Sequence, residues 1–147
     1  MVKTNINIAD IQLNSKLVKN FLRSEELNGF YSFKNDIKNY EDLIKKRSSF
    51  SVDKRLLMHN IVLEQYKNIR SLGLVSKSID ALKNPKTFTI TTGHQLCLNT
   101  GPIYFFYKIL HCIKISVELK KIYPKYNFVP VFWMASEDHD FEEIKSF

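Results

Sequence analysis

Apolar residues recur at helical spacing through the first half of the chain, residues 1–84. This periodicity predicts a helical segment that packs on the rest of the protein. Four helices are predicted. The first is capped by Asn14 or Ser15 and carries Leu17, Val18, Phe21 and Leu22 on one face, and the second covers residues 35–47 and carries Ile37, Tyr40, Leu43 and Ile44 on one face. The third runs from Asp53 to Gly73, with apolar positions Leu56, Leu57, Ile61, Leu63, Ile69 and Leu72, and the fourth runs from Leu74 to Leu82.

The pattern changes in residues 85–147. Thr87–Thr92 is β-branched and alternating, which predicts a strand. A loop bracketed by Gly93 and Gly101 follows, and Pro102 suits the first position of a helix. Residues 128–134 are apolar on both faces, as in a strand that is covered on both sides. The predicted helix carries an apolar stripe and ends at Pro124; the stripe consists of Ile103, Phe106, Leu110, Ile113 and Val117.

Strand, helix and strand in this order predict a β-α-β unit with parallel strands and a right-handed crossover. The expected fold class is therefore α/β: a helical N-terminal part followed by the start of a parallel sheet. The chain has 147 residues and is 44% hydrophobic, enough for one ordinary domain with a packed core.

The charge and the cysteine content of the chain argue against several classes of function. The net charge of +7 comes from lysines scattered along the chain, without the interleaved aromatic residues of a nucleic-acid-binding groove. We therefore expect no nucleic-acid partner. Neither Cys97 nor Cys112 sits in a CxxC pair, and residues 1–10 lack the apolar core of a secretory signal. The expected location is the cytoplasm, with reduced thiols and no membrane-spanning helix.

Polar residues cluster after each predicted strand. The first cluster contains Thr92–Gln95, and the second contains Glu137–Asp140. Because parallel strands end on the same edge of a sheet, and ligands bind outside the carboxyl ends of strands, the two clusters are expected to be neighbours.

The first cluster leads into a helix N-terminus, where N–H groups and the helix dipole favour an anion. Substrate or nucleotide binding is predicted for Thr92, Gly93, His94, Gln95, Thr100, Gly101 and Lys108. The alternative is a loop and helix cap that bind no ligand, in which His94 donates a hydrogen bond to a nearby backbone carbonyl. Tyr104, Tyr107 and His111 share a side of the helix with Lys108, and an aromatic flank without a ligand is the alternative for them.

The second cluster is the candidate catalytic group: Glu137, Asp138, His139 and Asp140. In an extended segment, residues i and i+2 share a face, so Glu137 pairs with His139 and Asp138 with Asp140. Such pairs can hold an amine, bind a divalent cation or act as general acid and base. A metal is not expected, because ligands this close in sequence cannot complete a coordination shell alone. The alternative is the capped, acidic first turn of a helix.

Short blocks in residues 88–145 resemble the N-terminal signature of the BshC family, the cysteine-adding enzymes of bacillithiol biosynthesis. The blocks are Thr92–Gln95, Thr100–Tyr104, Tyr107–Lys108, Val129–Trp133 and Glu137–Phe141. The resemblance implies a Rossmann-like core similar to class I synthetases and nucleotidyltransferases. It also implies a coiled coil that supports a homodimer, and the addition of cysteine to glucosaminyl-malate. ATP or another nucleotide is compatible with this chemistry, and the residues do not identify the energy source.

Two departures from the family pattern qualify the resemblance. Many members carry glutamine where this chain has His94. Members are also several hundred residues long, so we expect residues 85–147 to be only the start of the Rossmann-like core. The 147-residue chain alone is then expected to be inactive and poorly stable. An inactive remnant is the alternative function, and a basic nucleic-acid-binding domain fits less well.

Overall fold

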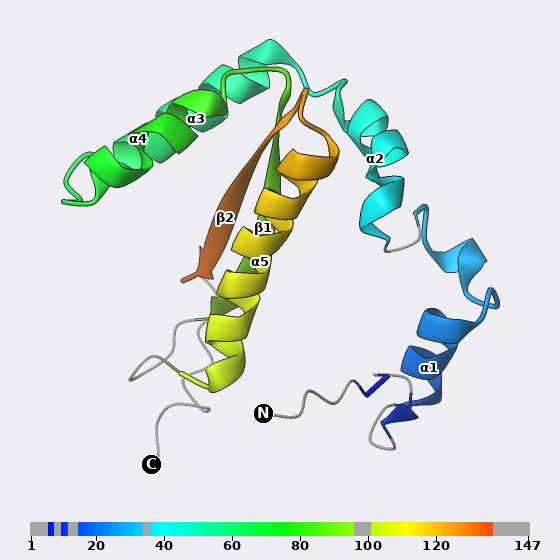
Figure 1. Cartoon of the computed structure of the whole chain (residues 1–147). Helices are drawn as coiled ribbons and strands as arrows, with labels where there is room; N and C mark the ends of the chain where they lie inside the picture. Colours follow the sequence, from blue (N-terminus) through cyan, green and yellow to red (C-terminus); the bar gives the residue numbers. More distant parts are fainter. Residues whose placement is uncertain (1–5, 8–9, 12–14, 34–35, 96–100, 137–147) are drawn as a thin grey trace. The chain divides into compact units, whose positions relative to one another are not determined.

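The computed structural model describes residues 6–7, 10–11, 15–33, 36–95 and 101–136 (Figure 1). The chain forms two compact units, Met1–Leu43 and Ile44–Phe147, and each is described by itself. The expected division of the sequence at residue 84 remains a prediction.

The first unit contains the helix α1, Lys16–Arg23, and two short 3-10 turns, Asn28–Phe30 and Ile37–Asn39. The Ser15 hydroxyl accepts the Val18 N–H at 3.3 Å, which confirms Ser15 as the predicted cap. Phe21 of α1 packs edge-on against Tyr31, with ring centroids 5.5 Å apart.

Three further helices precede the sheet: α2, Tyr40–Arg47, α3, Val52–Tyr66, and α4, Leu72–Ala81. Two helix boundaries differ from the prediction. The third helix ends at Tyr66 rather than at Gly73, and Gly73 lies in the first turn of α4. Turn hydrogen bonds, from Ile69 N–H to Tyr66 O and from Leu72 N–H to Ile69 O, separate the two helices.

The buried residues of α3 are not among the apolar positions that the sequence marked. Arg55 and His59 are its buried residues, whereas the apolar positions Leu56, Leu57, Ile61 and Leu63 are 42 to 60% exposed. Arg55 and His59 are four residues apart and therefore share a helix face. This polar face contacts α4 and the start of the sheet, so hydrogen bonds and an ion pair help to hold α3 in place.

A β-α-β unit forms the rest of the described structure: β1, Thr87–Gln95, α5, Ile103–Ile122, and β2, Asn127–Ala135 (Figure 1). The strands are parallel and in continuous register from Thr87 opposite Asn127 to Gln95 opposite Ala135. This confirms the predicted α/β class and parallel pairing. In the described residues the sheet has two strands, and α5 packs against both.

The start of α5 corrects two predictions. Gly93, His94 and Gln95 belong to β1 and pair with β2, so the strand extends three residues beyond its predicted end at Thr92. Pro102 is the extended N-cap of α5, with φ −69° and ψ 153°, rather than its first helical residue. Gly101 has φ 65°, a left-handed conformation that glycine adopts without steric cost, so it sets the turn into the helix.

The buried side of α5 carries two small residues and one large apolar residue. Cys112, Ser116 and Leu119 are buried, and the Cys112 thiol donates to Ile90 O at 2.9 Å. The predicted apolar stripe lies elsewhere: Ile103, Phe106, Leu110, Ile113 and Val117 are 44 to 71% exposed. The small side chains of Cys112 and Ser116 let the helix approach the strands closely, and Leu119, which is fully buried, contributes apolar area on the same face.

Coverage of β2 is partial in the described residues. Phe128 and Val129 are buried, whereas Trp133 and Met134 are exposed. The expectation that both faces are covered is therefore met at the start of the strand and not at its carboxyl end. No helix in the described ranges carries an apolar stretch that could cross a membrane.

Gly93 is required by the pairing of the two strands. A Cβ atom at this position would lie 2.7 Å from the Trp133 carbonyl oxygen and 3.0 Å from Trp133 Cβ. Gly93→Ala is therefore expected to lower the free energy of unfolding by about 1–3 kcal/mol, as overpacking does elsewhere. Gly73→Ala is the matched control, because a Cβ atom at Gly73 would have no neighbouring atom within 4 Å, and it is expected to stabilise helix α4 slightly. Urea unfolding of both variants of the full-length protein measures the difference; equal stabilities would contradict this account.

Candidate functional site at the carboxyl ends of the strands

Both strands of the sheet end at one edge, as predicted. The last residue of β1, Gln95, lies opposite the last residue of β2, Ala135. Thr92–Gln95, the first polar cluster, therefore ends at the sheet edge where β2 also ends, and the second cluster, Glu137–Asp140, follows β2 in the sequence. Thr100 and the segment 137–140 lie outside the described residues, so their positions stay predictions.

His94 connects the end of β1 to the start of α5. Its Nδ1 lies 2.9 Å from the backbone oxygen of Gln95, and its Nε2 lies 2.8 Å from the Tyr104 hydroxyl. The imidazole also contacts the rings of Tyr104 and Phe105, at centroid distances of 5.3 and 5.7 Å. The carbonyl contact expected if His94 bound no ligand is therefore present, together with a second contact that the sequence did not predict.

Aromatic packing supports this corner of the site. The ring of Phe105 lies edge-on to Phe132 of β2, with centroids 5.2 Å apart. Phe132 is the register partner of Thr92. The first turn of α5 is therefore held against both strands, and Tyr104 is held near His94.

An open hollow of about 480 Å³ runs along α5 and is lined by Tyr104, Tyr107, Lys108, Leu110, His111 and Lys114. The predicted shared side of Tyr104, Tyr107, Lys108 and His111 is confirmed. Lys114 was missed, although its spacing of three residues from His111 places it on the same side. Lys108 and Lys114 give the hollow positive charge, and Tyr104 both lines the hollow and contacts His94.

Cys112 is a packing residue rather than a nucleophile. Burial raises the pKa of its thiol, and hydrogen bonds with the backbone of Val131 and Thr92 only partly offset this effect. A thiol with a raised pKa provides little of the thiolate that reacts. Cys97 lies outside the described residues.

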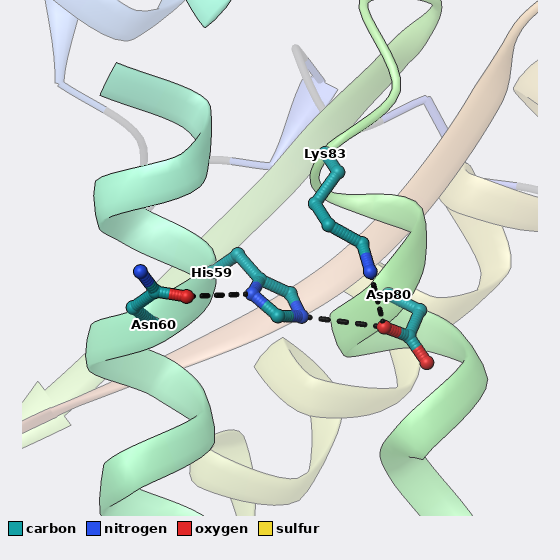
Figure 2. Close-up of polar contacts among 4 residues, drawn as sticks. All are labelled: His59, Asn60, Asp80 and Lys83. Atoms are coloured by element: carbon teal, nitrogen blue, oxygen red, sulfur yellow. Dashed lines mark hydrogen bonds and ion pairs between the residues drawn. The ribbon is translucent and has the colours of Figure 1, made fainter. Parts of the chain in front are cut away.

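A separate group of polar residues, which the sequence did not predict, joins α3 to α4 (Figure 2). Asp80 lies 3.3 Å from His59 Nε2 and 2.8 Å from Lys83 Nζ, and His59 Nδ1 lies 3.1 Å from the side-chain oxygen of Asn60. The hydrogen bond from Lys83, followed by that from His59, holds the pKa of the Asp80 carboxyl below its usual value. His59 and Asn60 lie on α3, Asp80 lies on α4 and Lys83 follows the end of α4, so the contact of His59 with Asp80 joins the two helices.

Comparison with known proteins identifies relatives of the chain. The sequence model described as "Bacillithiol biosynthesis BshC, N-terminal Rossmann-like domain" matches residues 1–147. A protein of Flavobacterium psychrophilum named "Putative cysteine ligase BshC" is 48% identical over 136 residues, which are 90% of this chain and 26% of the relative. A protein of Cytophaga hutchinsonii with the same name is 43% identical over 143 residues, 97% of this chain and 27% of the relative. The chain thus spans about a quarter of the length of these relatives.

Proposed function

The chain belongs to the BshC family and matches its N-terminal Rossmann-like domain, and from this premise we propose that the full-length protein adds cysteine to glucosaminyl-malate in bacillithiol biosynthesis. The observation that carries the proposal is the match of the family's sequence model to residues 1–147. The named relatives are described as cysteine ligases, which supports small-molecule substrates. We further propose a cytoplasmic homodimer.

We assign substrate or nucleotide binding to the first polar cluster. Thr92, Gly93, His94 and Gln95 end β1, and Gly101 sets the turn before the N-terminus of α5. A helix N-terminus favours an anion, such as a phosphate or a carboxylate. Lys108 lies in the second turn of α5 and lines the hollow, so its ammonium group supplies positive charge beside that position. Thr100 completes the proposed set.

We assign the chemistry to Glu137, Asp138, His139 and Asp140. Support comes from β2, which ends at Ala135, opposite Gln95. Amide formation needs an uncharged amine, and carboxylate and imidazole groups are suited to hold an ammonium group and remove its proton. The carboxyl group of cysteine would be activated by transfer of a phosphate or nucleotidyl group from a nucleotide such as ATP, bound at the helix N-terminus. The amine then forms the amide bond, and the activating group leaves with one carboxyl oxygen.

The test is an assay of the full-length protein with glucosaminyl-malate, isotopically labelled cysteine and ATP. We expect a product of the mass of bacillithiol, followed by mass spectrometry, and no product when the nucleotide is omitted. Failure of a folded protein to join the two substrates with any nucleotide would refute the proposed function.

Lys108 provides a variant for the binding assignment. Lys108→Met is expected to raise the KM for the nucleotide about tenfold, the effect of losing one charge-assisted hydrogen bond. Lys121→Met is the control, because Lys121 lies in the last turn of α5 and pairs with Glu118 at 2.9 Å. Equal KM values for the two variants would remove Lys108 from the site.

A further inference from the structure

The hydrogen bonds of His94 determine which ring nitrogen carries the proton. Nδ1 lies 2.9 Å from the carbonyl oxygen of Gln95, and a carbonyl oxygen can only accept. Nδ1 is therefore protonated. In the neutral imidazole, Nε2 then carries a lone pair, and the Tyr104 hydroxyl, 2.8 Å away, donates to it.

Both partners of His94 are held by the surrounding structure. Gln95 is the last residue of β1 and is paired with Ala135. Tyr104 lies in the first turn of α5, and its neighbour Phe105 is packed against Phe132. The position of each partner is thus set by backbone pairing or by aromatic packing, and the imidazole is held between them.

Tyr104 is also accessible to a ligand. Its side chain is 52% exposed and lines the hollow on α5. A ligand with a hydrogen-bond donor can therefore replace the Tyr104 hydroxyl at Nε2. A phosphate oxygen lacks a proton to donate at neutral pH and would bind at Nε2 only after the imidazole had taken up a second proton.

We propose that Nε2 of His94, which the Tyr104 hydroxyl occupies in this structure, is the position at which a donor group of the substrate, an amine or a hydroxyl, binds, and that the Tyr104 hydroxyl gives up this hydrogen bond when the substrate enters. His94 then recognises the amine-bearing sugar substrate and leaves the nucleotide phosphates to the helix N-terminus and Lys108. The identity of this substrate rests on the proposed function; the role of Tyr104 does not.

The experiment measures carbethoxylation of His94 by diethyl pyrocarbonate in the full-length protein, because this reagent attacks an unprotonated imidazole nitrogen. Tyr104→Phe keeps the ring and removes the hydroxyl. Tyr107→Phe is the matched control, since Tyr107 lines the same hollow and has no hydrogen bond to His94 among the described contacts. Peptide mass spectrometry locates the modification and gives its initial rate.

We expect Tyr104→Phe to raise the rate at His94 about fivefold, the effect of releasing one ordinary hydrogen bond, and Tyr107→Phe to leave it unchanged. Equal rates in the two variants would overturn the role of Tyr104.

Ligand protection identifies the group that His94 contacts. We expect glucosaminyl-malate to slow the modification of His94 in the wild-type protein and ATP alone to leave the rate unchanged. Protection by ATP, or by neither ligand, would overturn the proposed recognition. Protection depends on binding of the ligand and does not depend on turnover. A negative activity assay therefore counts against the proposed function and not against the recognition by His94.

Discussion

Arg55→Met is expected to lower the free energy of unfolding by about 3 kcal/mol, because it leaves a set of backbone carbonyls without their donor. Arg55 is 6% exposed. Its Nη1 lies 2.9 Å from Thr87 O, 3.1 Å from Asn84 O and 3.5 Å from Leu82 O, and its Nη2 lies 3.3 Å from Pro85 O. Methionine fills a similar volume and offers no donor, so the loss is chiefly one of hydrogen bonds.

The measurement is urea unfolding of the full-length protein, with helicity as the signal. Lys54→Met is the control, because Lys54 is the exposed neighbour of Arg55 in α3 and its substitution removes the same charge. Arg55→Lys should recover only part of the stability, since one ammonium group cannot reproduce the planar fork of a guanidinium. A stability of Arg55→Met close to that of Lys54→Met would show that the carbonyls are satisfied in another way.

The hydrogen bonds of Arg55 also affect the position of the first strand of the sheet. The residues that it binds, from Leu82 to Thr87, connect the end of α4 to the first residue of β1. The strand pairing begins at the same place, where Asn127 N–H donates to Lys86 O and Thr87 lies opposite Asn127. By holding the start of β1, Arg55 supports the register that brings Gln95 opposite Ala135 at the candidate site.

The β-α-β unit could be predicted because its signals are local. Alternation of β-branched residues marks β1, and Pro124 marks the end of the intervening helix. The parallel direction then follows from the long crossover, and with it the shared edge of the two strand ends.

The faces of the helices could not be predicted in the same way. On α3 and α5 the sequence marked stripes of apolar residues, whereas the buried residues are Arg55 and His59 on α3 and Cys112, Ser116 and Leu119 on α5. Which face packs depends on partners distant in sequence: Arg55 reaches carbonyls 27 to 32 residues away, and the Cys112 thiol reaches Ile90. Periodicity reports that a helix has an apolar face and does not report what that face contacts.

The candidate site was predicted in outline and missed in detail. The sequence indicated that polar residues follow both strands, and the strand register confirms that the strand ends meet. It did not indicate that Gly93 lies within β1, where its missing side chain makes room for the backbone of Trp133. The pairing of His94 with Tyr104 was also missed, because the two residues share no periodic pattern across the strand–helix junction.

The largest expected effect on activity concerns the acidic segment after β2. Asp138→Asn and His139→Ala are each expected to lower kcat by about 10²- to 10⁴-fold, the usual contribution of a positioned general acid or base. Neither change removes apolar area, and the segment follows a strand whose end pairs with β1, so the fold and its unfolding midpoint should be retained. Glu64→Gln on α3, an exposed carboxylate paired with Lys67, is the control and should leave kcat unchanged.

Bacillithiol formation by the full-length variants, measured together with their circular dichroism, separates chemistry from folding. Wild-type rates in both Asp138→Asn and His139→Ala would show that the acidic residues serve only as the start of a helix. A loss confined to Asp138→Asn would assign the segment to holding the substrate's ammonium group, since asparagine keeps the size of the side chain and removes its charge. A loss in both, with the fold intact, is the result expected if the carboxylate holds the ammonium group and the imidazole removes its proton.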